Sequence, residues 1–109
     1  MYKETNITHD GRKTGKSNLR LLEGDGMSVL MSYTTPVALK YFNSDGSESK
    51  WFFTRHKFSS TTSRQITCFL NAQGEGRKGG VETDHVYIAE GMKEMCRKHK
   101  LNSSVFNLV

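Results

Sequence analysis

The sequence predicts an α+β domain, in which an antiparallel meander of three to five strands precedes two helices packed on one face of the sheet. Three observations predict this class. The 109 residues suit one hydrophobic core and are too few for two. Apolar and polar residues alternate up to about residue 58, and after it apolar residues recur at three- and four-residue intervals. Strands that precede helices, rather than alternate with them, distinguish this pattern from a parallel βαβ fold.

The N-terminal segment is polar and holds turn-forming residues at Asp10, Gly11 and Gly15. It predicts a flexible basic N-terminal arm, 1–17, ahead of a single domain, 18–109. A short strand at about 3–7 is the alternative for part of the arm.

Four later segments combine apolar alternation with turn-forming residues between them, and they predict strands at 18–22, 27–33, 37–42 and 50–58. Gly24 and Gly26 lie in the first turn, and Gly46 lies in a hairpin loop. Pro36 is expected to interrupt the chain between the second and third strands, because proline has no backbone donor. Aromatic residues concentrate in the last of these strands, where they can seed a core.

The first predicted helix carries an apolar stripe of Ile66, Phe69 and Leu70. Thr62 and Gln65 fit a capping box, in which each side chain satisfies a free backbone donor. Gly74 fits the left-handed residue that follows many helices. The first helix is therefore expected to end just before it.

A glycine-rich linker, 74–80, leads to a second predicted helix that begins at 83–84. The apolar stripe of this helix comprises Ile88, Met92, Met95, Cys96 and His99. We expect His99 to be a partly buried packing residue, and Glu94 and Lys98 to pair on the opposite face.

The formal net charge of +5 and the isoelectric point of about 9.4 suit an anionic partner, such as nucleic acid, a nucleoprotein or an acidic protein surface. No apolar run approaches the ~18 residues that span a membrane. The N-terminus lacks the apolar core of a signal peptide. These features predict a cytoplasmic protein without a membrane partner. In such a protein we favour two buried thiols at Cys68 and Cys96, and a disulfide between them is the alternative.

Cationic side chains concentrate in the arm and in the segment 50–80, where Glu75 is the only carboxylate. The candidate contacts to a partner or to nucleic acid are Arg12, Lys13, Lys16, Lys50, Arg55, Lys57, Arg64, Arg77 and Lys78. Aromatic residues interleave with the cations on the last strand. This composition fits a platform for single-stranded nucleic acid, or a strand with one buried face and cations outside, which we favour. The linker fits either a phosphate contact through its glycines or an ordinary connection.

The segment 11–17 ends in Gly-Lys-Ser, as a phosphate-binding P-loop does, but the motif fails. Asp10 stands where the motif requires glycine, and no helix is expected after it. None of the four histidines lies at a metal-ligand spacing. Cys68 falls in a helix interior, where thiols are usually inert. The sequence therefore predicts a non-enzymatic protein with no catalytic residue, metal or cofactor.

Two blocks on either side of the aromatic strand carry a family resemblance. They are Tyr-Thr-Thr-Pro-Val-Ala at 33–38 and His-Lys-Phe-Ser-Ser-Thr-Thr-Ser at 56–63. In this order they resemble an uncharacterised family of small bacteriophage proteins, over about 26–73. The resemblance implies a phage accessory protein that works in a bacterial cytoplasm, and it carries over no catalytic residue.

By analogy, such a protein is expected to bind a host protein or nucleoprotein complex. The predicted function is a non-enzymatic binder or inhibitor of a host defence or nucleic-acid-processing complex, in the manner of an anti-CRISPR protein. The alternative is direct binding to DNA or RNA. A homodimer through an exposed edge strand is compatible with an open meander.

Overall fold

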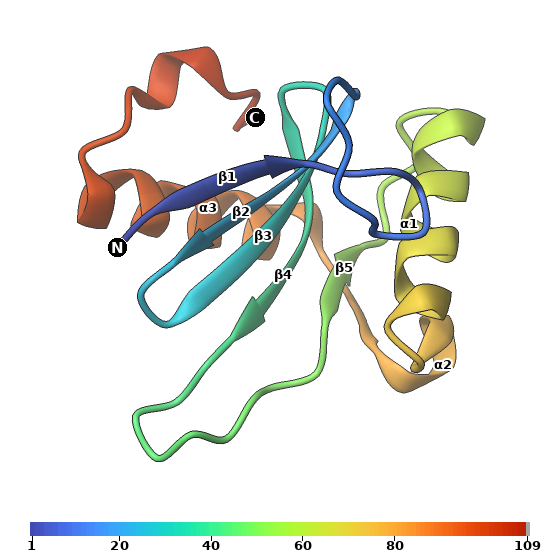
Figure 1. Ribbon diagram of the computed structural model, residues 1–109, viewed down its shortest axis with the longest axis horizontal. Coiled ribbons are helices and arrows are strands. Elements are labelled where there is room, and N and C mark those ends of the chain that lie inside the picture. The colour runs from blue at the N-terminus through green and yellow to red at the C-terminus, as the bar shows by residue number, and fades with distance from the viewer. Residues whose placement is uncertain (109) are drawn as a thin grey trace.

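Six strands lie in one sheet in the order of the sequence (Figure 1). The computed structural model describes residues 1–108. The strands are β1 Lys3–Asn6, β2 Leu19–Gly24, β3 Met27–Ser32, β4 Thr35–Tyr41, β5 Phe52–Thr54 and β6 Val81–Thr83. The helices are α1 Ser60–Ala72, α2 Gly76–Gly79 and α3 His85–His99, followed by the 3-10 turn η1 Ser103–Val105. The α+β class that the sequence predicts is confirmed.

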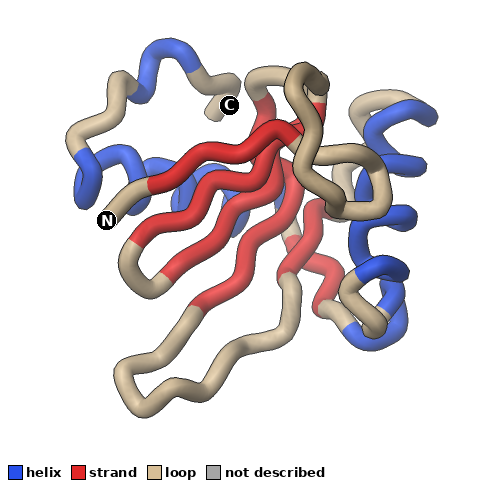
Figure 2. The backbone as a smooth tube through the Cα atoms, in the orientation of Figure 1, coloured by secondary structure: helices blue, strands red, loops and turns tan. Residues whose placement is uncertain are grey.

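The first five strands form an antiparallel meander, and β6 is parallel to β5. A tight turn can join antiparallel neighbours, whereas a parallel pair needs a crossover of a dozen or more residues. The helices α1 and α2 supply this crossover between β5 and β6 (Figure 2). β6 is absent from the predicted strands, because three residues are too few to show an alternating pattern.

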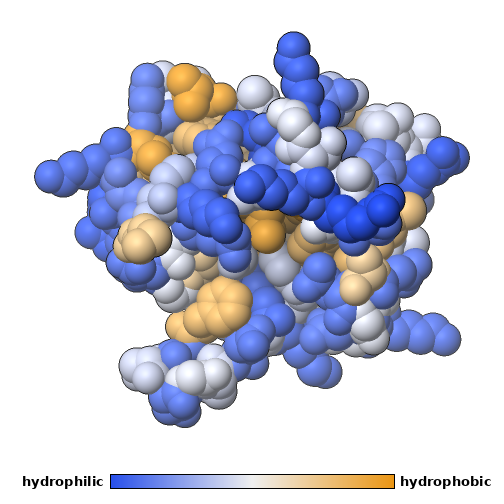
Figure 3. Space-filling model, in the orientation of Figure 1, coloured by the Kyte–Doolittle hydropathy of each residue, from blue (hydrophilic) through white to orange (hydrophobic). Residues whose placement is uncertain are grey.

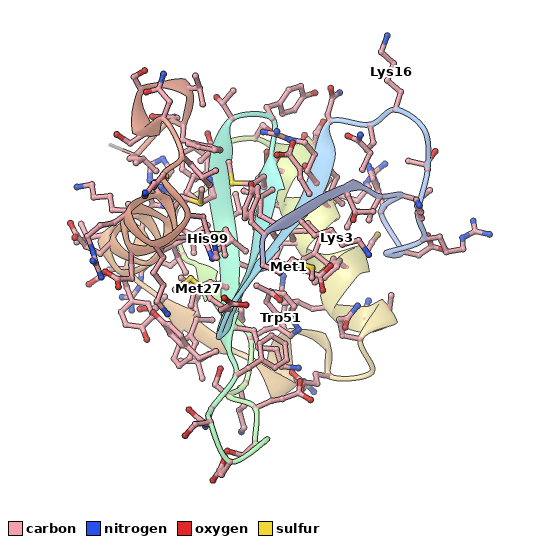
Figure 4. All side chains as sticks on the ribbon, turned by 60° about the vertical axis from the view of Figure 1, so that its left-hand side comes forward. Met1, Lys3, Lys16, Met27, Trp51 and His99 are labelled. Atoms are coloured by element: carbon pink, nitrogen blue, oxygen red, sulfur yellow. The ribbon has the colours of Figure 1, made fainter. Side chains whose placement is uncertain are left out.

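The helices α1 and α3 cover opposite faces of the sheet, which corrects the prediction that both helices pack on one face. Successive side chains of a strand point to opposite faces. In β3, Leu30 belongs to the core under α1, whereas Val29 and Met31 belong to the core under α3. Figure 4 shows the sheet between the two helices. A sheet covered on both sides needs strands that are apolar on both faces, and β3 is such a strand.

The core under α1 is rich in aromatic residues. Trp51 and Phe69 meet edge to face with their ring centroids 5.1 Å apart, a favourable arrangement for aromatic pairs. The predicted stripe is confirmed, since Ile66, Phe69 and Leu70 are buried. After the helix, Gly74 takes the expected left-handed conformation, with φ of +85°.

The first turn of α1 differs from the predicted capping box. Ser59 is the N-cap, and its side chain accepts a hydrogen bond from the backbone N–H of Thr62 at 3.1 Å. Thr62 and Gln65 are instead buried against the sheet, where both contact the side chain of Ser32. The run of hydroxyl residues at 59–63 offers several possible N-caps. Because Thr62 is buried against the sheet, Ser59 is the residue that caps the helix.

The core under α3 confirms the second predicted stripe, because Ile88, Met92, Met95 and Cys96 are buried there. Gly91 lets α3 approach β4, since a Cβ atom at this position would lie 2.3 Å from Leu39 Cδ2. His99 is half-buried, as predicted, and its ring lies 5.4 Å from the ring of Tyr2 (Figure 4).

The N-terminal segment belongs to the sheet, which corrects the predicted arm at 1–17. The strand β1 pairs with β2, and Ile7 is only 2% exposed. The alternative of a short strand at about 3–7 is therefore the one that the structure contains. Residues 7–18 connect these two strands.

Three further elements differ from their predicted bounds. Pro36 lies inside β4 rather than before it, opposite Met31, where the pairing register of β3 and β4 shifts. The strand expected at 50–58 is shortened to β5. The linker 74–80 contains the single helical turn α2.

The surface is largely polar in the view of Figure 3, with apolar side chains in small separate groups. On α3, Glu94 pairs with Arg97 rather than with the predicted Lys98. Within residues 1–108, no helix has both the length and the apolar character needed to cross a membrane.

Candidate functional site

The parallel strands β5 and β6 end side by side, and the chain leaves them toward opposite faces. β5 ends at Thr54 and continues to α1, whereas β6 ends at Thr83 and continues to α3. In open sheets, ligands bind in the crevice outside the carboxyl ends of strands where successive connections diverge in this way. The fold therefore indicates a candidate ligand site at the loop between β5 and α1 (Figure 1).

A pocket of about 310 Å³ lies at this place, and we call it the crevice pocket. Its lining comes from β5 and the loop after it, and from α1, α2 and β6: Thr54, Arg55, His56, Lys57, Ser63, Ile66, Arg77 and Glu82. Three cations and one carboxylate give the lining a formal charge of +2 (3 − 1), with the histidine neutral. The pocket therefore favours an anion.

Arg77 is held in place by α1. Its Nε donates to Thr67 Oγ1 at 2.7 Å, and its NH2 group donates to the backbone oxygen of Ser63 at 3.1 Å. The guanidinium carbon lies 5.2 Å from the ring centroid of Phe53, within cation–π distance. A guanidinium fixed in this way presents its remaining donors to the pocket in one orientation.

The other two cations of the pocket lie on the loop after β5 and are exposed. Arg55 pairs with Asp84 at 3.3 Å, and both side chains are solvated, so the pair contributes little and can exchange for another anion. Lys57 has no ion-pair partner within 4.0 Å among residues 1–108. The positive charge of the loop is therefore available to a ligand.

Two shallower hollows adjoin the crevice pocket. One, of about 470 Å³, is lined by Arg77 and Lys78 together with residues of α1. The other, of about 400 Å³, is lined by Lys57 and three serines at the start of α1. Arg64 lies at four- and three-residue spacing from Ser60 and Thr67 of these hollows, and so on the same helix face.

Five of the nine predicted cations therefore meet around the outer face of α1. We call them the basic surface: Arg55, Lys57, Arg64, Arg77 and Lys78. The loop after β5 and α2 lie at opposite ends of α1 in the sequence, and the crossover brings their side chains to the same surface. The sequence therefore predicts which residues are cationic, but their clustering depends on the crossover.

Two histidines pack against Phe58: His56, which lines the crevice pocket, and His85. The rings of His56 and His85 lie 4.4 and 4.9 Å from the ring of Phe58, and 6.2 Å from each other. His85 Nδ1 lies 3.0 Å from Thr54 Oγ1, and His85 Nε2 is buried without a hydrogen-bond partner among residues 1–108. Burial, and after it the charge of His56, lower the pKa of His85 below its ordinary value.

The remaining predicted cations line none of the three hollows. Arg12, Lys13 and Lys16 belong to the loop between β1 and β2, and Lys16 projects into solvent (Figure 4). Lys50 is exposed on the connection between β4 and β5, outside all three hollows. The segment 11–17 joins two antiparallel strands, so it lacks the strand-to-helix setting of a P-loop.

Three of the aromatic residues of 50–58 pack in the two cores and are not free to stack on bases, whereas Phe58 is half-buried beside His56. Trp51 and Phe53 are buried under α1, and Phe52 packs against Tyr41 and Tyr87 on the other face. The favoured interpretation, in which the aromatics are core residues with cations outside, is confirmed, although both faces of the strand are covered rather than one.

Sequence reasoning misses His56, Phe58 and His85 as a group. His56 and Phe58 follow β5, and His85 begins α3 just after β6. The one sequence feature that could indicate a site is therefore their position just after a strand. Because β6 is not predicted, the sequence does not indicate that His85 follows a strand parallel to β5. The contact depends on that pairing.

The two cysteines lie on different helices and are unpaired, with Cys68 half-buried on α1 and Cys96 buried on α3. Burial raises the pKa of the Cys96 thiol. In the described part of the chain, no three His, Cys, Asp or Glu side chains gather where they could hold a metal ion.

Fold and site together define a small α+β domain with a cationic pocket at the carboxyl end of a parallel strand pair. The chain belongs to a family of unknown function, DUF8033, whose model matches residues 2–85. This match includes the whole lining of the crevice pocket and ends at the first residue of α3. No curated protein and no solved structure matches the chain significantly. The family description names no activity, partner or source, so the resemblance to bacteriophage proteins and the anti-CRISPR-like function stay predictions.

Proposed function

We propose that this protein is a non-enzymatic nucleic-acid-binding module that contacts the phosphate backbone through its basic surface. The observation that carries the proposal is the convergence of Arg55, Lys57 and Arg77 on one pocket. Phosphate contacts from arginine and lysine supply most of the affinity in sequence-independent binding.

The buried aromatics determine the kind of contact that we propose. Base stacking needs exposed rings, and Trp51 and Phe53 lie in the core. Backbone contacts need only cations and hydrogen-bond donors along a strand of phosphates. The basic surface offers these over the loop after β5, α1 and α2, so we expect binding that depends strongly on salt and weakly on base sequence.

A charge-reversal experiment tests the proposal. The double variant Arg55→Glu/Lys57→Glu is compared with Lys3→Glu/Lys93→Glu, which makes the same change in net charge at exposed positions of β1 and α3, outside all three hollows. Affinity for a mixed-sequence oligonucleotide, measured by fluorescence anisotropy over a range of salt concentrations, should fall at least about tenfold in the first variant. Its log–log salt slope should become shallower by roughly two phosphate contacts.

The control pair should retain most of the affinity, and circular dichroism should show both variants folded. Wild-type protein that binds no oligonucleotide at low salt would refute the proposal. Equal losses in the two variants would also refute it, since net charge alone would then explain binding.

A second candidate is the predicted inhibitor that binds a protein or nucleoprotein complex. The observation in its favour is an exposed apolar group at β6 and the start of α3, where Val81, Val86 and Tyr87 are 38%, 70% and 39% exposed. Exposed apolar groups beside a free sheet edge suit a protein partner. Val86→Asp should then abolish stoichiometric recovery of a host complex in a pull-down, while Val105→Asp, at another exposed valine, should not.

A further inference from the structure

We propose that the crevice pocket is a subsite for a phosphate monoester, namely the phosphorylated end of a nucleic-acid strand whose other phosphates lie along the basic surface. This inference rests on the proposed function and adds a specific ligand group to it. Its basis is the difference between the crevice pocket and the two hollows beside it.

The first difference is charge. A phosphate monoester carries about −1.5 to −2 at neutral pH, whereas each backbone phosphodiester carries about −1. The lining of the crevice pocket has a formal charge of +2. In contrast, the hollow that contains Lys78 combines two cations with Glu75, and the hollow at the start of α1 has one cation. Only the crevice pocket, among the three, matches a dianion.

The second difference is shape. The crevice pocket is the smallest and most enclosed of the three hollows, at about 310 Å³. This volume lies at the lower end of the range for ligand pockets, which is about 300–1,000 Å³. A backbone that passes over a surface needs an open groove, whereas a chain end can enter a more enclosed pocket. The two open hollows fit the first case, and the crevice pocket fits the second.

The third difference is the set of donors that lie beside Arg77, which also lines the hollow that contains Lys78. A guanidinium has five N–H donors, and α1 takes two of those of Arg77, which leaves three (5 − 2). The side chains of Arg55, His56 and Ser63 line the same pocket and can each donate. A terminal phosphate has three free oxygens, one more than a diester, and can use this larger set of donors.

The carboxylate in the lining does not neutralise the site. Glu82 forms no ion pair within 4.0 Å in the described chain. The side chains of Arg55 and Asp84 are both exposed to solvent, so a phosphate can replace the aspartate at a small cost in free energy.

The test uses the full chain and one mixed-sequence oligonucleotide of about 12 nucleotides, a length suited to a site of this size. It is prepared with a 5′-phosphate, with a 3′-phosphate, or with hydroxyls at both ends. At fixed salt, one of the phosphorylated forms should bind at least about tenfold more tightly than the hydroxyl form, as expected for an added charge-assisted contact. Arg55→Gln should abolish this preference. Lys78→Gln, outside the crevice pocket, should weaken all three forms by a similar factor and keep the preference.

Inorganic phosphate and a nucleoside monophosphate serve as probes without a strand. Equal, salt-dependent binding of the three oligonucleotides would overturn the subsite and leave the proposed function intact. Binding of inorganic phosphate that Arg55→Gln abolishes, without oligonucleotide binding at low salt, would overturn the proposed function and keep a phosphate subsite. A preference that survives Arg55→Gln would place the end-recognition elsewhere and overturn the assignment to this pocket.

Discussion

Arg77 belongs both to the fold and to the site. Its contacts with Thr67 and Ser63 fasten α2 to α1, and its position over Phe53 covers the edge of the core. The sequence shows only a cation in a glycine-rich linker. Whether such a cation faces solvent or a pocket depends on where the crossover returns to the sheet, and no local pattern encodes that.

His85 provides a residue-scale prediction for pH. Its pKa in the folded protein is lowered by burial and then by His56, so the unfolded chain binds more protons at His85 as the pH falls below its ordinary value of about 6.5. Stability should therefore be complete above that value and decrease as the pH falls from about 7 toward 5. His85→Gln should flatten this part of the curve of unfolding free energy against pH.

The matched control for this prediction is His9→Gln, which removes an exposed histidine from the loop after β1. Urea unfolding at several pH values between 5 and 8 measures both variants. A His85→Gln curve as steep as that of the wild type, or flattening by His9→Gln alone, would contradict the assignment of the slope to His85.

At the scale of elements, β3 explains the difference between the predicted and the observed layers. The consecutive apolar residues Val29, Leu30 and Met31 cannot share one face of a strand, so the sequence itself indicates a strand buried on both sides. A prediction from alternation alone uses Val29 and Met31 and leaves Leu30 unexplained. The stripes of α1 and α3 are predicted correctly because each is long enough to repeat, whereas β6 is too short.

The contact between β3 and α1 supplies the element-scale prediction. Ser32 Oγ donates to Gln65 Oε1 at 2.5 Å and lies 3.2 Å from Thr62 Oγ1, and all three residues are buried. Ser32→Ala removes a partner from two buried polar groups, so it should cost about 1–3 kcal/mol of unfolding free energy. Thermal and urea unfolding measure the loss.

Thr61→Ala is the control for this variant, because Thr61 lies in the same turn of α1 and is exposed. It should change the unfolding free energy by less than about 0.5 kcal/mol. Losses of equal size in the two variants would show that the turn, rather than the buried hydrogen bonds, determines the effect.

At the scale of the whole molecule, the family match covers less of the chain than the folded domain does. The match ends at residue 85, yet α3 begins there and packs on one face of the sheet. Leu22, Val29 and Leu39 on that face are fully buried beneath it. The part of the chain that the family model describes therefore contains the candidate site but lacks the helix that completes one of the two cores.

A fragment that ends at residue 85 should consequently fail to fold. The side chains that it loses from the core are Ile88, Met92, Met95 and Cys96. At roughly 1.5–3 kcal/mol for each large buried side chain, their burial contributes as much as the whole stability of a typical domain, which is about 5–15 kcal/mol. The fragment should bind a hydrophobic dye and lack the near-ultraviolet dichroism of Trp51. The full chain with Val105→Ser, a change at an exposed site beyond α3, should retain both native properties.

Complementation separates a missing core from a generally damaged chain. A synthetic peptide of residues 84–109 added to the fragment should restore the dichroism of Trp51, because α3 packs on the sheet through side chains and not through strand pairing. Trp51 lies under α1, on the opposite face, so its recovery would report that the two cores fold as one cooperative unit. A fragment that unfolds cooperatively without the peptide would instead show that α1 and the sheet form a stable domain alone, with α3 as an accessory cover.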